Sequence, residues 1–300
     1  MRVLISGGSG LVGSALTNAL RADGTAVSHF VRPGGTPNQG DVRWDPSRAT
    51  VDVPALEGFD AIVHLSGASI ADGRWTDKRK ALLRSSRVDS TRVLVDSLAH
   101  LKQPPRVFVC ASAIGYYGDR GDEVLTESSG YGNDFLSILC RAWEGEAARA
   151  AASGIRTVMT RFGVSLATQG GALPRMLTPF KLGVGGRLGN GKQWISWVAL
   201  EDVVQILRAA IVDEKMHGPL NVVAPNPVQN SEFTKVLAGV LHRPAIFPAP
   251  AFALRLALGQ MADALLLSSQ RVQPEKLVAS GYKFRYENLQ PALQAILPAT

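Results

Sequence analysis

A glycine-rich turn close to the first residue constrains the fold more than any other part of the sequence. The apolar run Val3-Leu4-Ile5-Ser6 leads into Gly7-Gly8-Ser9-Gly10-Leu11-Val12-Gly13, and a helical pattern follows at once. In this strand-turn-helix context, glycines let the backbone approach a pyrophosphate, and the helix N-terminus offers free N–H groups. A purely structural glycine-rich turn is the alternative. The turn predicts a dinucleotide site built by Gly7, Ser9, Gly10, Leu11, Val12 and Gly13.

Strand-like and helix-like segments alternate through the first half of the chain. Helical spacing of apolar residues covers Leu11–Ala22 and Asp77–Leu101. Such alternation is typical of a parallel sheet with helices on both faces. We therefore expect an α/β fold with a Rossmann-type doubly wound parallel sheet. The expected strands are Arg2–Ser6, Ala26–Arg32, Asp41–Asp45, Ala61–Ser66, Arg106–Ser112 and Ile155–Arg161.

The composition of the sequence changes after Arg161. Glycines punctuate residues 170–191, and another αβ unit follows at Glu201–Val223. We expect an NADP-binding domain over residues 1–165, completed by about residues 199–224, and a smaller C-terminal α/β substrate lobe over residues 166–198 and 225–300. The apolar stretch Ala249–Leu267 carries charged and polar residues at near-helical spacing, which predicts an amphipathic helix rather than a membrane span.

The end of the second expected strand indicates which dinucleotide the turn prefers. An NAD-selective site usually has an acid about 20 residues after the glycines, where it holds the ribose 2′-hydroxyl. This chain has Phe30-Val31-Arg32 at that place. A guanidinium can form a fork with a 2′-phosphate, so we expect NADP(H). A solvated surface arginine is the alternative for Arg32.

Charge and cysteine content argue against several classes of function. Lys plus Arg outnumber Asp plus Glu by 32 to 25, but the charges are spread along the chain, so no nucleic-acid site is expected. Neither Cys110 nor Cys140 has a Cys or His partner at metal-ligand spacing. We therefore expect no metal site, no membrane association and a reducing, cytoplasmic compartment.

Three motifs resemble the extended short-chain dehydrogenase/reductases: Ser6-Gly7-x-x-Gly10-x-x-Gly13, His64-Leu65-Ser66-Gly67-Ala68, and the run from Ser112 to Asp119. Other segments resemble the group called epimerase family proteins, and together they cover nearly the whole chain. They are Arg141-Ala142-Trp143-Glu144, Arg161-Phe162-Gly163-Val164, the run from Gly189 to Trp197, and the run from Ser268 to Pro274. The resemblance implies a Rossmann fold with a small C-terminal substrate lobe.

The resemblance also implies particular contacts. It places NADP(H) against Leu65, Ser66, Arg87 and the loop Arg161-Phe162-Gly163-Val164. Gly67 belongs to the same run of small residues at a strand end as Ser66, although small residues that merely end the strand explain it almost as well. Extended relatives often dimerise through two helices, so the helix expected over Asp77–Leu101 is a candidate surface for a homodimer.

The catalytic pair of that family is missing from the sequence. Its proton donor is a tyrosine that a lysine four residues later makes more acidic. None of the five tyrosines has a lysine at this spacing, and the resemblance puts Leu136 and Cys140 at the two positions. If catalysis persists, Tyr117 is a candidate acid and Ser112 a candidate hydrogen-bond donor to the substrate or the nicotinamide amide. A packing role for Tyr117 is an equal alternative, and Cys140 is read as a small buried hydrophobe.

The glycine-rich stretch offers a candidate substrate pocket. Lys192, Trp194 and Trp197 could supply one cation and two aromatic walls, although core packing explains either tryptophan as well. Two functions follow. One is an NADP(H)-dependent oxidoreductase or epimerase-like enzyme on a small carbonyl or sugar-like compound. The other is a catalytically silent NADP(H)-binding sensor.

Overall fold

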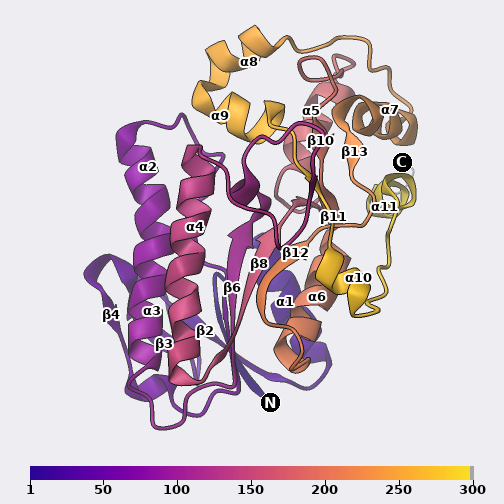
Figure 1. Cartoon of the computed structure of the whole chain (residues 1–300). Coiled ribbons are helices and arrows are strands. Elements are labelled where there is room, and N and C mark those ends of the chain that lie inside the picture. The colour runs from indigo at the N-terminus through magenta and orange to yellow at the C-terminus, as the bar shows by residue number, and fades with distance from the viewer. Residues whose placement is uncertain (298–300) are drawn as a thin grey trace.

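A sheet of eight strands forms the centre of the molecule (Figure 1). The computed structural model describes residues 1–297. The strand order is β12-β8-β6-β5-β1-β2-β3-β4, and all neighbours are parallel except β3 and β4. The α/β fold and the parallel sheet expected from the sequence are confirmed. The strands are β1 (Arg2–Ser6), β2 (Ala26–Val31), β3 (Val42–Asp45), β4 (Thr50–Val51), β5 (Ala61–His64), β6 (Val107–Ala113), β8 (Arg156–Phe162) and β12 (Gly218–Val222).

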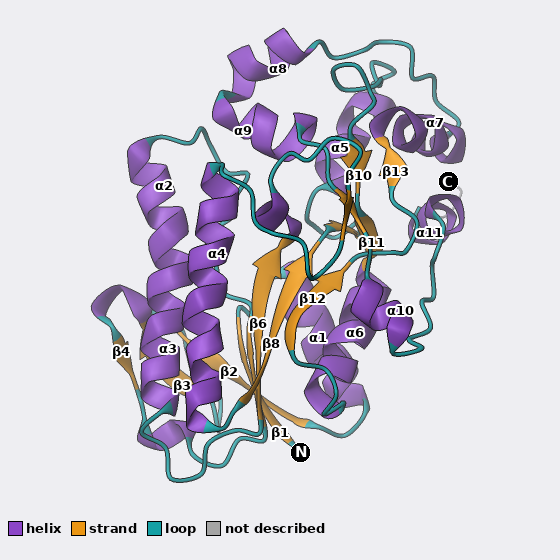
Figure 2. Cartoon of the chain, viewed as in Figure 1, coloured by secondary structure: helices purple, strands orange, loops and turns teal. Residues whose placement is uncertain are grey.

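Helices cover both faces of this sheet (Figure 2). Helices α1 (Leu11–Ala22) and α6 (Leu200–Val212) lie on one face, and α2 (Asp77–Arg84), α3 (Ser90–Leu98) and α4 (Phe135–Ala148) lie on the other. Successive side chains of a strand point to opposite faces. Accordingly Leu4 of β1 packs in the core under α3 and α4, whereas Val3 and Ile5 pack under α1 and α6. This double burial explains why the central strands read as continuous apolar runs.

The helix expected over Asp77–Leu101 is interrupted. A π-helical turn, Ser85–Asp89, joins α2 to α3, and the helix ends at Leu98. The side chain of Ser90 donates to the carbonyl of Ser86 at 2.9 Å. One wider turn hardly disturbs the apolar spacing, so the sequence pattern did not reveal it. Such turns are frequent at functional sites, and this one carries Arg87.

Most of the remaining elements gather at the carboxyl end of the sheet and beyond it, whereas α10 packs beside β12 (Figure 1). Three short strand pairs join distant segments: β7 with β14, β9 with β11, and β10 with β13. Phe180, Trp197, Phe233 and Leu293 belong to the core of this region. Its elements are β7 (Val124–Leu125), β9 (Val164–Leu166), α5 (Leu173–Lys181), β10 (Trp194–Ile195), β11 (Trp197–Ala199), β13 (Val228–Gln229), α7 (Asn230–Leu241), α8 (Ala251–Leu258), α9 (Gln260–Ala262), β14 (Arg271–Val272), α10 (Glu275–Ala279) and α11 (Leu289–Ile296).

The single amphipathic helix expected over Ala249–Leu267 is likewise broken. Gly259 ends α8 with a φ of 62°, a left-handed conformation that glycine adopts at little cost, and α9 and a π-helical turn (Asp263–Leu267) follow. Over residues 1–297, no helix combines the length and the apolar character needed to cross a membrane.

Candidate functional site

The glycine-rich turn occupies the space between β1 and α1. Gly7 has a φ of 72°, and a Cβ on it would lie 2.9 Å from the carbonyl carbon of Leu65. A Cβ on Gly13 would lie only 2.2 Å from the carbonyl oxygen of Gly7. Among the described residues, no side chain caps the N-terminus of α1, which starts after Gly10. Its first N–H groups are therefore left for a ligand, and an anion is the ligand that a helix N-terminus favours.

A buried hydrogen-bonded cluster fixes the two strand ends beside this turn. The Ser6 hydroxyl oxygen accepts the N–H groups of Leu65 at 3.1 Å and Ser66 at 3.2 Å. Ser6 therefore has its own proton to donate, and the Nδ1 atom of His64 lies 2.7 Å away. This arrangement requires a neutral imidazole with an unprotonated Nδ1. Burial lowers the pKa of His64 to about 4, in agreement with that geometry.

Arg32 and Arg87, the two arginines expected to contact the dinucleotide, have different surroundings. Arg32 is exposed directly after β2, with no ion-pair or hydrogen-bond partner for its guanidinium among the described residues. Arg87 instead folds back onto the segment after β5: it donates to the carbonyl of Ala68 at 3.0 Å and lies over the ring of Trp143 at 5.3 Å. A Cβ on Gly67 would lie 3.1 Å from the Cζ atom of Arg87. The structure thus brings Gly67 and Arg87 together.

A strap formed by residues 170–175, which lead into α5, contacts both sides of the candidate site. A Cβ on Gly171 would lie 3.2 Å from the side chain of Leu11, in the first turn of α1. Further along the strap, Arg175 of α5 donates to the carbonyl of Ala71 and pairs with Asp72, both at 2.8 Å. The strap therefore touches the glycine turn and the loop after β5, the two segments between which a dinucleotide would lie. The sequence analysis did not find these contacts, because they join residues more than a hundred positions apart.

Ser112 and Tyr117, the two candidate catalytic residues, take part in one buried network. The Ser112 hydroxyl donates to Glu144 Oε1 at 2.6 Å. The Tyr117 hydroxyl donates to Asn221 Oδ1 at 2.7 Å and accepts from Arg161 at 2.9 Å. Both side chains are buried, and burial raises the pKa of Tyr117 to about 12. Each hydroxyl proton has an acceptor inside the protein, which is consistent with the packing role that the sequence left open for Tyr117.

Arg161 holds the centre of that network. Its Nε and Nη2 atoms each donate to a different oxygen of Glu144 at 2.8 Å, so the pair is bidentate and buried. The segment Arg161-Phe162-Gly163-Val164 was expected as a loop, but it forms the end of β8 and the start of β9. The Arg161 side chain points into the protein because Glu144 neutralises it there. Gly163 is needed because a Cβ would lie 2.5 Å from the carbonyl oxygen of Ser196.

The sequence analysis missed the partners that complete this network. Glu127 is buried and accepts the N–H of Asn221 at 3.0 Å, while the Asn221 amide donates to the carbonyl of Gln273 at 2.9 Å. Burial raises the pKa of Glu127. Glu144 stood in a quoted motif, yet nothing in its spacing indicated an ion pair. The bulky, buried Trp143 beside it indicates only that this part of α4 faces the core.

The expected substrate pocket is not assembled as the sequence suggested. Trp197 is fully buried and donates to the carbonyl of Asn226 at 3.0 Å, so the packing alternative holds for it. Trp194 is half-buried: it donates to Asp122 at 2.7 Å, and the guanidinium of Arg271 lies 4.5 Å from its ring centroid. Lys192 is exposed. No group of three potential metal ligands occurs within residues 1–297.

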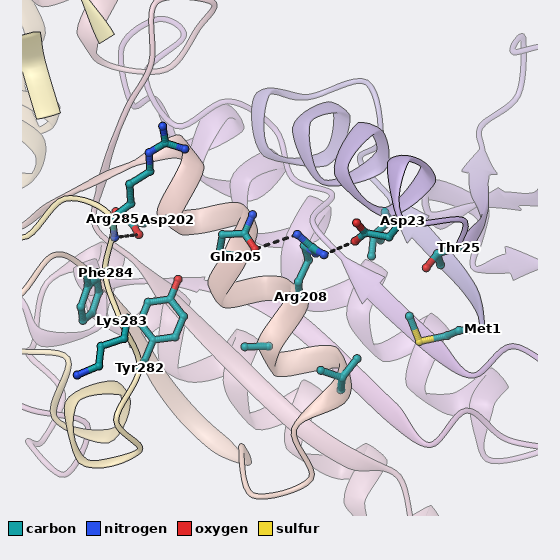
Figure 3. A pocket seen from close by; sticks show the side chains of 13 residues that line it. Met1, Asp23, Thr25, Asp202, Gln205, Arg208, Tyr282, Lys283, Phe284 and Arg285 are labelled. Carbon is teal, nitrogen blue, oxygen red and sulfur yellow. Dashed lines mark hydrogen bonds and ion pairs between the residues drawn. The ribbon is translucent and has the colours of Figure 1, made fainter. Parts of the chain in front are cut away.

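A groove of about 580 Å³ lies at the opposite, amino edge of the sheet (Figure 3). Met1, residues of α6 and the segment Tyr282–Arg285 line it, and Arg208 pairs there with Asp23. The glycine-rich turn follows the other end of β1, so the length of that strand separates the two places. This groove is therefore not the dinucleotide site.

Comparison with known proteins places these features in a family. Residues 3–223 match the model of the NAD dependent epimerase/dehydratase family, and residues 249–296 match a domain of unknown function, DUF1731. An epimerase family protein of Mycobacterium leprae is 40% identical over 292 residues, covering 97% of this chain and 94% of its own length. The epimerase family protein YfhF of Bacillus subtilis is 39% identical over 301 residues, covering 99% and 98%.

The structural comparison agrees. The human epimerase family protein SDR39U1 (isoform 2), solved with NADPH, superposes with a TM-score of 0.91 at 34% identity and covers 99% of both chains. The match of the family model to residues 3–223 and the likeness over the full length of these relatives lead to one conclusion. The chain belongs to the NAD dependent epimerase/dehydratase family, among the epimerase family proteins.

Proposed function

We propose that the protein binds NADP(H) and acts as an oxidoreductase or epimerase-like enzyme on a small carbonyl or sugar-like compound. The observation that carries the binding half concerns two groups that have no side-chain partner within residues 1–297. They are the N-terminus of α1 behind the glycine-rich turn and the guanidinium of Arg32 at the end of the neighbouring strand. The human relative solved with NADPH supports this choice of cofactor. The bound cofactor would supply or accept a hydride.

The chain's own residues fit the parts of such a cofactor. The N–H groups of the turn, from Gly7 and Ser9 to Gly13, would hold the pyrophosphate, and Arg32 would bind the 2′-phosphate. Leu65, Ser66 and Gly67, which Ser6 and Arg87 position, would line the middle of the dinucleotide. Phe162, Gly163 and Val164, where β8 passes into β9, would lie near its nicotinamide end. The cytoplasmic location and the homodimer stay predictions.

The test is titration of the cofactor-stripped protein with NADPH and NADH, followed through cofactor fluorescence. We expect Arg32→Ala to weaken NADPH binding about 10- to 100-fold, about 1.4 to 2.7 kcal/mol, and to leave NADH binding nearly unchanged, because only NADPH carries the 2′-phosphate. The matched control is Arg48→Ala, an exposed arginine that pairs with Asp45 after β3. Equal losses for both cofactors, or no binding of either by the wild type, would contradict the proposal.

The second candidate is a catalytically silent NADP(H)-binding sensor. The observation that favours it is the buried network, in which the hydroxyl protons of Ser112 and Tyr117 both have acceptors within the protein. The two candidates differ in turnover. Consumption of NADPH that depends on an added acceptor and on the protein excludes the sensor, whereas tight NADPH binding without turnover of any acceptor class favours it.

A further inference from the structure

The net charge of the chain comes from one part of the molecule. The C-terminal lobe, residues 166–198 and 225–300, contains 11 Lys and Arg but only 4 Asp and Glu, whereas the rest of the chain contains 21 of each kind. The whole excess of +7 therefore belongs to this lobe, although cations are spread along the chain. Five of the lobe's cations are exposed and have no ion-pair partner within residues 1–297: Lys181, Arg187, Lys192, Lys235 and Arg243.

Helix α8 of this lobe is almost entirely apolar, and yet it is not buried. Seven of its eight residues are apolar, and the eighth is Arg255, which pairs with Asp263 at 2.9 Å. None of the eight is buried: Phe252 is 73% exposed, and Leu256, one turn later, is 77% exposed. A helix with apolar residues on all sides is normally buried in a core or in lipid. Within residues 1–297, α8 lacks the partner that its composition predicts.

The segment before α8 extends the apolar surface. Ile246 and Phe247 are both exposed, and so is Val184 in the neighbouring segment. The N–H of Phe247 donates to the carbonyl of Gly185 at 3.1 Å, and a Cβ on Gly186 would lie 1.9 Å from the carbonyl oxygen of Phe247, so the two backbones are in direct contact. Figure 1 shows α8 and the loop before it at the outer edge of the molecule, away from the sheet. One continuous stretch of chain thus presents exposed apolar side chains on the outside.

Cations lie beside these apolar side chains. A groove of about 530 Å³ is lined by Arg187 and Lys235 together with Ile246 and Pro248, and no Asp or Glu of the described residues lines it. The carbonyl of Arg187 accepts the N–H of Ala249 at 2.9 Å, which joins this cation to the segment that leads into α8. The outer surface of the lobe therefore combines apolar side chains with positive charge that no neighbouring carboxylate compensates.

The positive charge decides which partner fits this surface. A second copy of the chain would bring two lobes of the same sign together, which is unfavourable. A nucleic acid would neutralise the cations but would leave the aliphatic side chains in water. An anionic lipid bilayer matches both features, because its headgroups attract Lys and Arg while Phe and Leu side chains enter the boundary between headgroups and acyl chains.

We propose that the outer surface of the C-terminal lobe, formed by residues 184–187, Lys235 and residues 245–256, binds the surface of an anionic lipid bilayer. Phe252 and Leu256 enter the interface, and Arg187 and Lys235 contact lipid headgroups. The contact is peripheral, since the eight residues of α8 are far fewer than the about 20 that span a bilayer. This proposal replaces the sequence-based expectation of no membrane association, and it does not depend on the NADP(H) site.

Flotation with lipid vesicles tests the proposal on the full-length protein. One set of vesicles contains phosphatidylcholine alone, and the other also contains about 40% phosphatidylglycerol, which is anionic. We expect the partition coefficient to be at least about 10-fold higher for the anionic vesicles. It should fall as NaCl rises from about 0.05 to about 0.5 M, because salt screens the attraction between cations and headgroups.

Two double variants separate the apolar and the electrostatic contributions. Phe252→Ser with Leu256→Ser should lower partition into anionic vesicles at least about 10-fold, because the apolar side chains no longer leave water. Arg187→Gln with Lys235→Gln should lower it at least about threefold. All four side chains are exposed, so thermal unfolding and NADPH binding should stay at the wild-type values.

Matched controls change exposed side chains on α2 and α4, outside the C-terminal lobe. Leu82→Ser with Ile138→Ser removes two exposed apolar side chains, and Lys78→Gln with Arg84→Gln removes two exposed cations. Both control proteins should float like the wild type, since these residues do not belong to the proposed surface.

A fluorescent reporter measures entry into the lipid directly. Phe252→Trp replaces one exposed aromatic side chain by another, and the signal of the wild type, which has five tryptophans elsewhere, is subtracted. On anionic vesicles we expect the added emission to move to shorter wavelength, and lipids brominated on their acyl chains should quench it. Headgroup attraction alone would hold the protein at the surface without this quenching.

Several results would overturn the proposal. These are equal flotation with both lipid compositions, unchanged flotation of the apolar double variant, an equal loss in the matched controls, and no quenching by brominated acyl chains. Binding to polyglutamate or to duplex DNA without flotation would overturn it as well, because the partner would then be a soluble acidic protein or a nucleic acid. Failure of the wild type to bind NADPH would remove the proposed function and leave this proposal standing.

Discussion

The two ends of the candidate site treat their polar groups in opposite ways. At the proposed adenosine and phosphate end, no side chain among the described residues caps the first N–H groups of α1 or pairs with the guanidinium of Arg32. At the carboxyl ends of β6 and β8, the polar groups of Ser112, Tyr117, Glu144 and Arg161 hydrogen-bond to one another inside the protein. Groups that the fold leaves unpaired are the ones a ligand can use. The comparison explains why family membership supports nucleotide binding here more strongly than it supports the family's usual chemistry.

The largest expected effect tests whether the buried pair of Arg161 and Glu144 stabilises the fold. Arg161→Met removes the bidentate partner of Glu144 and leaves a buried carboxylate unpaired. We expect the free energy of unfolding, measured with urea, to fall by about 3 to 5 kcal/mol. Arg149→Met is the control, since this exposed arginine pairs with Asp96 and Glu146 at the surface, where about 0 to 1 kcal/mol is usual. Similar losses of unfolding free energy in both variants would show that the buried network contributes no more stability than a surface ion pair.

A smaller effect, the dependence of stability on pH, tests the role of His64 at the strand ends beside the glycine-rich turn. The pKa of this imidazole is lowered from 6.5 to about 4 in the folded protein, so between those values the unfolded chain binds the proton more readily. Stability should therefore fall as the pH drops below 6.5, by about 2 kcal/mol at pH 5 and by about 3 kcal/mol once the pH is below 4. NADPH binding should weaken in parallel, because Ser6 and His64 hold the strand ends beside the turn.

Urea unfolding at pH 7 and pH 5 measures that effect. His64→Asn should lose most of the dependence on pH, whereas His100→Asn, a change at an exposed histidine, should keep it. Other groups titrate in all three proteins, so the difference between the variants isolates His64. An unchanged slope in His64→Asn would show that the imidazole does not control this end of the site.

The smallest expected effect sharpens the role of Tyr117. Tyr117→Phe removes one donor to Asn221 and one acceptor for Arg161, and we expect the free energy of unfolding to fall by about 1 kcal/mol without a change in NADPH affinity. Thermal unfolding and fluorescence titration measure the two quantities. Tyr117 would be a proton donor after all if turnover disappeared while stability and NADPH affinity stayed at the wild-type values.

Much of the fold could be predicted because its signals are local. The strand Arg2–Ser6, the glycines after it and the helix that starts at Leu11 occupy consecutive residues, and the burial of the central strands is visible as uninterrupted apolar runs. The position of Arg32 followed from the same local order. The π-helical turn at Ser85–Asp89 and the break at Gly259 could not be predicted as easily, because one altered turn barely changes the apolar spacing.

The sequence by itself determined the parallel sheet, the glycine-rich turn and the family, since residue order alone encodes the glycine spacing and the alternation of strands and helices. Only the tertiary structure decided what Ser112, Tyr117 and Arg161 do. Their partners lie 32, 104 and 17 residues away in the chain, at Glu144, Asn221 and Glu144. The sequence shows the same hydroxyl or guanidinium whether that group donates a hydrogen bond to a ligand or to a buried carboxylate. Folding makes that choice, because a polar group that is buried without a partner destabilises the protein more than the same group inside a satisfied network.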